Sequence, residues 1–373
     1  MNKILIVGQT PPPFHGQAIA IQEILNACKE FKEVRNVRMS FSHKISDIGK
    51  FQIKKILELF TVVGKIWWYK IYWGCNIIYF PPTGGVSKIP LYRDFFVLIT
   101  TRFLFKKTIF HFHAGGINEI YDRLNLFEKK MFCLAYKYPD ISVIMSREGI
   151  KDTESVCSKK IKIIPYGLKD SFENVSKLHH YNIRKNNKKI TILFVGIVRK
   201  TKGVKVLLEA VSVLVNSGLC ITLNIIGGLE SEDFDIELRK FIADNSLEEV
   251  VNLLGIKIGT EKDFMFRQAD IFCFPTFYEC ENFPNVLMEA MMYSLPIVTT
   301  EWRGNCTLVQ NNVNGFLCPI QSVSHVADSL RLLIKDQDLR YSMGSNGRKK
   351  YEEEYRIEIF SQNIINLFEE IDI

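Results

Sequence analysis

The sequence predicts an α/β protein of two domains, each built on a parallel sheet. Its 373 residues exceed the length that one hydrophobic core usually serves. Short apolar runs alternate with longer stretches of helical spacing in both halves of the chain, which is the pattern of βαβ units. The apolar residues (47%) and charged residues (24%) stand at ordinary globular levels. We therefore expect two folded cores.

Five short apolar runs in the first half are predicted to be strands of one doubly wound sheet. They are residues 4–7, 77–80, 108–113, 141–145 and 162–164. Between residues 165 and 189 the alternation stops in a polar stretch, which is typical of a connection between domains. We therefore expect one domain over residues 1–168 and a second over residues 169–354.

A second series of apolar runs follows this connection and predicts a second sheet of the same kind. It comprises residues 190–195, 223–226, 251–254, 271–274 and 297–300. Each run is followed by glycines or by a helical pattern, as βαβ units require. Residues 355–373 then place apolar side chains near helical spacing, so we expect this last segment to bury one face against another element.

Basic residues are concentrated in the first half of the chain. Residues 1–170 contain 26 Lys and Arg against 14 Asp and Glu, whereas the remainder contains 22 against 27. No nucleic-acid-binding module accompanies this charge, so we expect anionic lipid rather than nucleic acid as its partner. Residues 50–73 mix basic with large apolar side chains, as a helix lying on a membrane surface does. The alternative is an ordinary helix whose aromatic residues pack on the core of the first domain.

Other features favour a cytoplasmic protein without a metal. Residues 1–3 lead directly into a predicted strand, with no apolar region of signal-peptide length. The nine cysteines are scattered, without a Cys-x-x-Cys pair or a histidine at ligand spacing, which disfavours both a zinc site and a disulfide framework. Charged residues interrupt the longest apolar stretch, so we expect no membrane-spanning helix.

Two glutamates in the second half, Glu281 and Glu289, flank a proline. Proline favours the first turn of a helix, so we expect a helix to start near Phe283 or Pro284. Glu281 would then lie on the preceding loop and Glu289 inside the helix. The free amides of the first turn would face an anion such as a diphosphate, which the helix dipole favours. On spacing alone, two ordinary surface carboxylates near a helix start are the alternative.

Residues 269–276 and 281–299 together resemble the signature of family-4 glycosyltransferases, which are retaining enzymes of the GT-B fold. The resemblance implies two Rossmann-like domains that face each other across a deep cleft, with residues 355–373 crossing back to complete the first domain. It also implies that the Glu-x7-Glu pair binds a nucleotide-sugar donor, with Glu281 near the sugar and Glu289 at the ribose. The residues implied at the donor diphosphate are Phe283, Pro284, Asn285 and Val286.

The predicted strand at residues 190–195 is followed by Gly196 and a basic turn. This turn resembles the family's donor-binding loop, in which an Arg and a Lys hold the phosphates. Lys202 matches that Lys, whereas Ile197 stands where the Arg is frequent. The second cation would therefore be Arg199 or Lys200. Cations at a leaving diphosphate stabilise its developing charge, so such enzymes can work without a metal. A solvated basic turn is the alternative.

Two further loops are similar to donor-binding segments of the family. Residues 8–18 resemble its first glycine-rich loop, where Gly16 allows a close approach of the backbone to the donor. His113 ends a predicted strand, and the resemblance places it beside the donor sugar, while His111 is expected to pack within the sheet. The family recognises the nucleotide base with the segment that here includes Ile256. An ordinary proline-rich turn and two structural histidines are the alternatives.

The sequence thus predicts a retaining, metal-independent glycosyltransferase that needs no cofactor. It would transfer a hexose or N-acetylhexosamine from a nucleotide-diphosphate sugar, UDP rather than GDP, to a hydroxyl of a glycan acceptor. The basic first half favours a lipid-linked acceptor at the inner face of the cell membrane, as in O-antigen or capsule assembly. A nucleotide-sugar epimerase and a non-catalytic nucleotide-sugar-binding protein are the alternatives. A nicotinamide dehydrogenase is disfavoured, because no Gly-x-Gly-x-x-Gly turn follows the first strand.

Overall fold

The computed structural model describes residues 3–12, 16–31, 33–39, 53–85, 87–172 and 189–371. The chain divides into two compact units. The first unit contains Met1–Gly167, Glu279–Phe283 and Glu358–Ile373, and the second contains Leu168–Tyr278 and Pro284–Ile357. The short segment Glu279–Phe283 therefore packs with the first unit, although elements of the second unit precede and follow it in sequence. The predicted second domain, residues 169–354, included this segment.

The first unit is built on a parallel sheet with the strand order β2-β1-β3-β4-β5-β6. Its strands are β1 (Ile4–Gly8), β2 (Val34–Arg38), β3 (Ile77–Phe80), β4 (Lys107–Phe112), β5 (Ile141–Ile144) and β6 (Lys160–Ile163). All of them except β2 overlap a predicted run. Strand β2 escapes prediction because its apolar residues, Val34 and Val37, are three apart and give no alternation.

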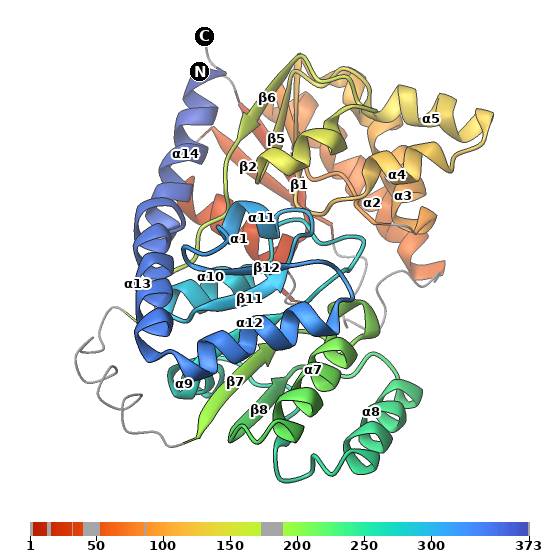
Figure 1. Ribbon diagram of the computed structural model, residues 1–373. Coiled ribbons are helices and arrows are strands. Elements are labelled where there is room, and N and C mark those ends of the chain that lie inside the picture. The colour runs from red at the N-terminus through yellow and green to blue at the C-terminus, as the bar shows by residue number, and fades with distance from the viewer. Residues whose placement is uncertain are drawn as a thin grey trace. The chain divides into compact units, whose positions relative to one another are not determined.

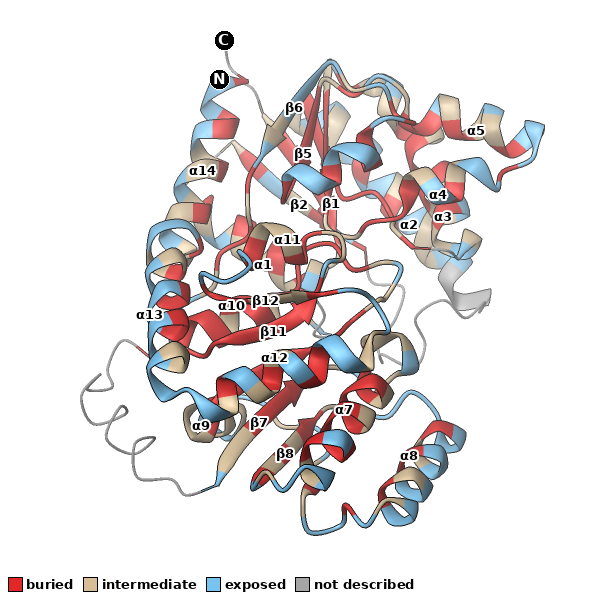
Figure 2. Ribbon diagram, in the orientation of Figure 1, coloured by how far each residue is buried: buried red, intermediate tan, exposed pale blue. Residues whose placement is uncertain are grey.

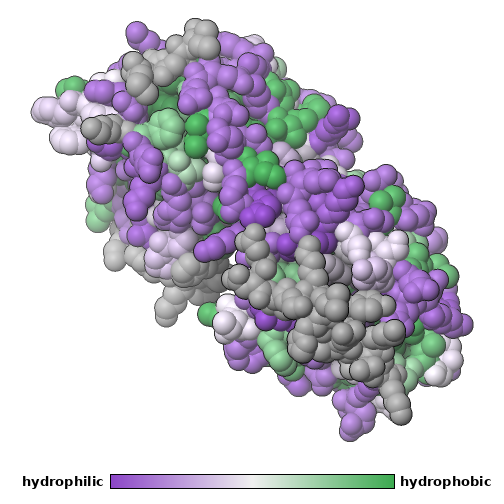
Figure 3. Space-filling view, turned by 90° about the vertical axis from the view of Figure 1, so that its left-hand side faces the viewer, coloured by the Kyte–Doolittle hydropathy of each residue, from purple (hydrophilic) through white to green (hydrophobic). Residues whose placement is uncertain are grey.

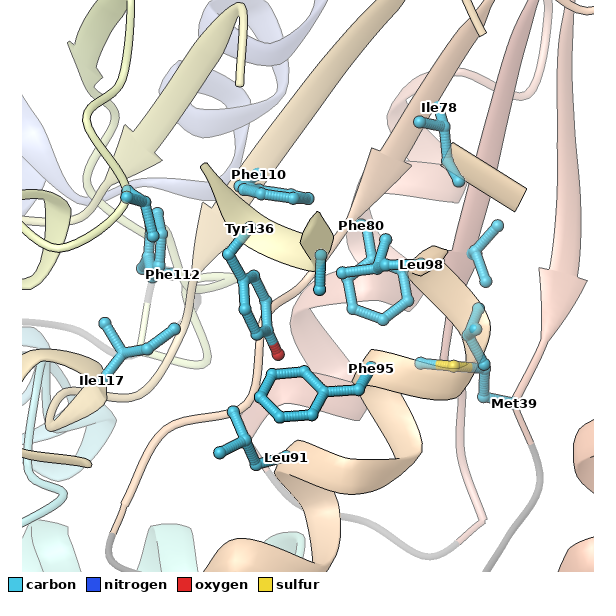
Figure 4. Close-up of a cluster of buried hydrophobic side chains, with 14 of the residues drawn as sticks. Met39, Ile78, Phe80, Leu91, Phe95, Leu98, Phe110, Phe112, Ile117 and Tyr136 are labelled. Carbon is cyan, nitrogen blue, oxygen red and sulfur yellow. The ribbon is translucent and has the colours of Figure 1, made fainter. Parts of the chain in front are cut away.

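Helices α2, α3 and α5 pack side by side on one face of this sheet. The helices of the first unit are α1 (Gly16–Ala27), α2 (Ile53–Trp68), α3 (Lys88–Thr101), α4 (Ile117–Asp122), α5 (Leu126–Tyr136) and α14 (Ile357–Glu370). Figure 4 shows the core beneath them, in which Phe110 of β4 contacts Tyr136 of α5. The Tyr136 ring in turn meets Phe95 of α3 with ring centroids 6.1 Å apart. Edge-on aromatic contacts of this kind fill the space between sheet and helices.

Side chains at alternate strand positions point to the opposite face of the same sheet. There Tyr79 of β3 contacts Phe368 of α14, with ring centroids 6.0 Å apart. His111 of β4 lies next to Tyr79 on this face. Helix α14 buries Phe360, Ile364, Leu367 and Phe368. The helical spacing of the last segment therefore matches a helix that covers one face of the first sheet.

A buried carboxylate fixes the loop that follows β3. Asp94 is 0% exposed and accepts hydrogen bonds from the backbone N–H of Thr83 (2.8 Å) and the hydroxyl of Tyr136 (2.7 Å). Its other oxygen pairs with Arg93 at 2.6 Å. Burial raises the pKa of Asp94, and the charge of Arg93 is the largest of the effects that oppose the rise.

We expect Asp94→Ala to lower the free energy of unfolding by about 3–5 kcal/mol, because the change leaves buried donors and the Arg93 charge without their acceptor. Urea denaturation followed by circular dichroism measures the loss. Asp122→Ala is the matched control, since Asp122 is exposed at the end of α4 and should change stability by less than about 0.5 kcal/mol. Equal stabilities of the two variants would refute the anchoring role.

The second unit has a parallel sheet with the order β12-β11-β10-β7-β8-β9. Its strands are β7 (Ile190–Val195), β8 (Ile221–Ile226), β9 (Val251–Leu253), β10 (Ile271–Phe274), β11 (Ile297–Thr300) and β12 (Gly315–Cys318). Five of them overlap predicted runs. Strand β12 was not among the predictions, because it opens with a glycine, which weakens the pattern of a strand.

Two layers of helices accompany this second sheet. Its helices are α7 (Val204–Asn216), α8 (Glu232–Asp244), α9 (Thr260–Gln268), α10 (Asn285–Met292), α11 (Asn305–Leu308), α12 (Val323–Lys335) and α13 (Gln337–Glu354). Helices α7 and α12 pack side by side, and α10 packs against α13 (Figure 1). Figure 2 shows the buried residues of α7 and α12 on their inner sides and the exposed residues on their outer sides. This is the burial expected of amphipathic helices on an α/β sheet.

An ion pair connects α13 to the segment that enters the second unit. Arg348 is bound to Asp170 by two hydrogen bonds, and their side chains are 8% and 1% exposed. The same guanidinium donates to the carbonyl of Met292 at 2.8 Å, at the end of α10. A bidentate arginine therefore holds three segments of this unit together.

The surface on the side of α13 and α14 is mainly hydrophilic, and its hydrophobic residues stand in small groups (Figure 3). Within the part of the chain that the structure describes, none of the helices has both the length and the apolar content that crossing a bilayer requires.

Candidate functional site

The carboxyl ends of β7 and β8 approach each other closely in the second unit. A Cβ atom on Gly227 would lie 1.7 Å from the carbonyl oxygen of Gly196, so a side chain cannot be accommodated there. The backbone of Gly196 is held by a hydrogen bond from its N–H to the carbonyl of Ile226 (2.9 Å). In open α/β sheets, ligands bind at this edge, beyond the carboxyl ends of the strands.

Lys202 lies on the short turn between β7 and α7. The next residue, Gly203, has a φ of +79°, and a Cβ there would lie 2.0 Å from the carbonyl oxygen of Pro275. Only glycine fits this position, which brings the turn against the end of β10. The Lys202 ammonium stands over two aromatic rings, 4.6 Å from the centre of Tyr278 and 5.3 Å from that of Phe274. These rings restrict where the cation can lie.

The two candidates for a second cation differ in their surroundings. The Arg199 guanidinium lies 4.9 Å from the centre of the Tyr278 ring and pairs with Glu230 at 2.7 Å. Lys200 is exposed. Arg199 and Lys202 therefore both lie over the Tyr278 ring. The backbone of Tyr278 is held in turn by a hydrogen bond from the Trp302 indole to its carbonyl (2.9 Å).

Helix α10 begins at Asn285, with Pro284 at the N-cap and no side-chain hydrogen bond to the first turn. This start lies within two residues of the predicted one. Asn285 and Val286 are half-buried, and their N–H groups belong to the first turn, where no carbonyl within the helix can accept them. Phe283 and Pro284 are buried immediately before it. The result is a helix end whose amides and dipole favour an anion.

Glu289 lies about one turn inside α10 and pairs with Lys262 of α9, at 2.6 Å from Oε1 to Nζ. Among the described residues its Oε2 atom is buried without a hydrogen-bond partner. Burial raises the pKa of Glu289, and the charge of Lys262 opposes the rise. Both side chains line a cavity of about 80 Å³, together with Lys169 and Tyr293 among others. Lys262 was not singled out by the sequence, because nothing in its helix indicates the pairing.

Ile256 follows β9 and Gly255. It lies in the segment that the family resemblance predicts to bind the nucleotide base. Its side chain is 71% exposed. A Cβ on Gly228 would lie 3.3 Å from the Ile256 side chain, so the residue packs against the glycine pair that follows β8. Ile256 thus presents an apolar surface close to the carboxyl end of the second sheet.

In the first unit, His111 and His113 form a pair at the end of β4. Their ring centroids are 4.0 Å apart, as expected for side chains two positions apart on a strand. The Tyr79 hydroxyl is hydrogen-bonded to Nδ1 of His111. Burial lowers the pKa of His111 well below its usual range, and the neighbouring His113 adds to the effect, so the His111 ring is neutral near pH 7. His111 is thus packed within the sheet, and His113 stands at its edge.

Glu281 is also a residue of the first unit and is 8% exposed. The adjacent Asn282 donates a hydrogen bond from its side-chain amide to the carbonyl of Phe112 (3.0 Å), at the end of β4. The segment that carries Glu281 is therefore attached to the strand that leads to His113. The sequence drew no attention to Asn282, since an asparagine before a helix has many structural roles.

Gly16 is the first residue of α1 and is exposed, and a Cβ there would meet no atom within 4 Å. The three residues before it, in the predicted glycine-rich loop, lie outside the described part of the chain. No group of three or more His, Cys, Asp or Glu side chains that could hold a metal ion occurs among the described residues.

The candidate site residues therefore fall into two sets. The second unit holds Lys202 and Arg199 on one aromatic ring, the open start of α10, and Glu289 beside its cavity. The first unit holds His113 and Glu281. Their segments are connected by the hydrogen bond from Asn282 to the carbonyl of Phe112 in β4. The chemistry available to the second unit is anion binding by amides and cations next to a carboxylate that accepts hydrogen bonds.

Comparison with known proteins identifies a family and relatives that match part of the chain. Residues 176–350 match the family model described as glycosyl transferases group 1. The capsular polysaccharide biosynthesis glycosyltransferase CapM of Staphylococcus aureus is 29% identical over 255 residues, which cover 66% of this chain and 64% of CapM. The amylovoran biosynthesis glycosyltransferase AmsK of Erwinia amylovora is 31% identical over 186 residues, 49% of this chain and 45% of AmsK. The chain thus covers less than two thirds of either relative.

Solved structures share the architecture of the whole chain. Sucrose-phosphate synthase from Thermosynechococcus elongatus superposes with a TM-score of 0.77 over 99% of both chains, at 14% identity. HepE of Anabaena, solved in complex with UDP, gives a TM-score of 0.74 over 99% of this chain and 100% of its own, at 16% identity. At such low identity these similarities show the fold, which is that of two Rossmann-like domains.

Proposed function

We propose that this chain, whose residues 176–350 match the group 1 glycosyl transferases and which has the GT-B fold, is a retaining glycosyltransferase of surface-polysaccharide assembly. It moves a hexose or N-acetylhexosamine from a nucleotide-diphosphate sugar to a hydroxyl of a glycan acceptor, without a metal or cofactor. The observation that carries the proposal is the uncapped start of α10 with Glu289 one turn inside it. The roles of CapM and AmsK in polysaccharide biosynthesis support this proposal.

The donor diphosphate binds at the amides of Asn285 and Val286, after the buried Phe283 and Pro284. Lys202 supplies the principal positive charge, because its ammonium is confined over Tyr278. Arg199 is favoured over Lys200 as the second cation, since it shares that ring whereas Lys200 is exposed. The backbone at Gly196 is placed so that no side chain obstructs the phosphates. Gly16, at the start of α1, allows a close approach in the same way.

The nucleoside is bound by Glu289 and by the segment around Ile256. The unpaired Oε2 atom of Glu289 is an acceptor that the ribose hydroxyls can satisfy. Uridine is preferred over guanosine as the base, and the complex of HepE with UDP supports this choice.

Transfer keeps the anomeric configuration. The bond between the sugar C1 and the diphosphate oxygen breaks, and the acceptor oxygen forms its bond to C1 on the same face. The acceptor proton passes to an oxygen of the departing diphosphate, whose charge Lys202 and Arg199 stabilise. His113 and Glu281 bind the transferred sugar, and the neutral His111 packed on His113 holds its ring in place.

The test is a panel of UDP- and GDP-sugars, each incubated with and without lipid-linked glycan acceptors. The proposal predicts that nucleotide is released only with an acceptor, and that the product keeps the anomeric configuration of the donor. An epimerase would instead alter the donor without an acceptor, and a binding protein would retain nucleotide without turnover. Either result would replace the proposed function.

We further propose that the acceptor is lipid-linked and that the first unit touches an anionic membrane. Helix α2 and the π-helical turn after it, Tyr69–Trp73, have two different faces. Val62 and Ile66 are buried in the core, so one face packs as an ordinary amphipathic helix does. The other face leaves large side chains exposed, and these are Leu57, Phe60, Trp68, Ile71 and Tyr72. The excess of Lys and Arg in residues 1–170 supports an anionic lipid partner.

We expect the double variant Trp68→Ser, Tyr72→Ser to bind vesicles of anionic lipid at least about tenfold more weakly, since each ring buries apolar area in the interface. Vesicle cosedimentation at low salt measures the affinity. The matched control is Ile236→Ser, Leu332→Ser, which removes two comparably exposed apolar residues of the second unit. Equal affinities of the two double variants, or equal binding of wild type to uncharged vesicles, would contradict the membrane proposal.

A further inference from the structure

Asn282 connects the two residues of the first unit that the proposed function places at the transferred sugar. It follows Glu281 directly in sequence. Its side-chain amide donates to the carbonyl of Phe112 at 3.0 Å, and Phe112 directly precedes His113. Asn282 is 6% exposed and Phe112 is 1% exposed, so the bond is shielded from water. One hydrogen bond therefore links two short stretches of chain that each carry a candidate sugar-binding residue.

The neighbouring backbone leaves the Asn282 segment little freedom. A Cβ on Gly85 would lie 2.6 Å from Sγ of Cys280, so Cys280 packs directly on the glycine of the loop after β3. That loop is joined to the loop after β4 by a hydrogen bond from the Gly85 N–H to the Gly115 carbonyl (2.9 Å). On the other side, a Cβ on Gly149 would lie 3.8 Å from Oδ1 of Asn282. The segment is thus in close contact with the first unit at two points, the Cys280 side chain and the Asn282 carboxamide.

The chemistry of the contact requires an amide at this position. The Phe112 carbonyl can only accept a hydrogen bond, so the amide nitrogen of Asn282 must face it. Aspartate has the same shape but would direct a negative oxygen at the carbonyl. Alanine would remove the donor and leave a buried acceptor without its partner. The hydrogen bond to Phe112 therefore depends on the amide group of Asn282 as well as on the size of its side chain.

We propose that Asn282 is a positioning residue that holds the Glu281 carboxylate and the His113 ring in a fixed relation. This inference rests on the proposed function, which assigns both residues to the sugar. Asn282 touches neither donor nor acceptor in this role. Its effect falls on the chemical step, because a displacement of about 1 Å in a reacting site can lower a rate about 100-fold. Binding of the nucleotide should change little, since Lys202, Arg199, Asn285, Val286 and Glu289, which carry the proposed phosphate and ribose contacts, belong to the second unit.

The test compares Asn282→Asp with Asn245→Asp. Asn245 also donates from its side-chain amide to a backbone carbonyl, that of Phe241 at 2.8 Å, but lies at the end of α8 in the second unit. We expect Asn282→Asp to lower kcat about 10- to 100-fold, with the KM for donor and the Kd for UDP changed by less than about twofold. The control should keep kcat within about twofold of wild type. A kcat that Asn282→Asp leaves unchanged, or a loss confined to the KM for donor, overturns the inference.

Hydrogen exchange of the backbone amides separates this inference from the proposed function. In Asn282→Asp the amides of Glu279–Phe283 should exchange faster, while those of α10 stay as protected as in wild type. This readout does not require activity, so it decides the matter even if no sugar donor is ever turned over. Unchanged exchange in Glu279–Phe283 overturns the inference on its own. Should Asn282→Asp fail to fold, Asn282→Ala is measured in the same two ways.

Discussion

Replacing Lys202 with alanine should lower kcat/KM at least about 100-fold, because a preorganised charge at the leaving group contributes most in the transition state. The ammonium is already held over Tyr278 and Phe274 before any donor binds, so little reorganisation accompanies the reaction. The decrease should fall on kcat more than on the KM for donor, since the charge on the diphosphate increases as the sugar leaves. Initial rates of nucleotide release with varied donor measure both quantities.

The control for this prediction is Lys240→Ala, which removes an exposed lysine of α8 and should leave kcat/KM within about twofold of wild type. Circular dichroism checks that both variants are folded. If Lys202→Ala transfers sugar as fast as wild type, the assignment of the phosphate cation is wrong. Comparing Arg199→Ala with Lys200→Ala then identifies the second cation, and we expect the larger loss for Arg199.

Replacing Glu289 with alanine should also lower kcat/KM at least about 100-fold, but mainly by raising the KM for donor. A charged carboxylate that accepts two ribose hydroxyls contributes about 1.5–3 kcal/mol per hydrogen bond, and these bonds exist before the chemical step. Titration calorimetry with UDP should show the same loss of affinity. The matched control is Glu353→Ala on α13, whose exposed side chain pairs only loosely with Lys349 at 3.9 Å.

The raised pKa of Glu289 adds a test by pH. In the proposed donor site the ionised carboxylate is the form that would accept both ribose hydroxyls, and burial raises its pKa above the usual range of glutamate. As the pH falls, wild type should therefore lose UDP affinity earlier than an ordinary glutamate would, whereas Glu289→Gln should show no such dependence. Equal pH profiles of the two proteins would argue against Glu289 as the ribose ligand.

Much of the fold follows from local patterns in the sequence. Strands such as β3 and β10 are continuous apolar runs, because both faces of a parallel sheet are covered by helices. The start of α10 follows from Pro284, because the proline ring suits the N-terminal end of a helix and its missing N–H costs nothing there. Strand β2 (Val34–Arg38) was missed because three of its five residues are polar. It lies at the edge of the sheet, where polar side chains can remain in solvent.

What the sequence determined by itself was the alternation of two α/β halves and the residue types of a candidate donor site, since both depend on neighbours along the chain. Only the tertiary structure decided which side chains meet. It paired Lys262 with Glu289, placed Arg199 beside Lys202 on one ring, and put Glu279–Phe283 into the first unit through Asn282. Such contacts depend on how distant segments pack. A single polar residue in a helix or loop belongs to no periodic pattern, so the sequence does not indicate which residue it contacts.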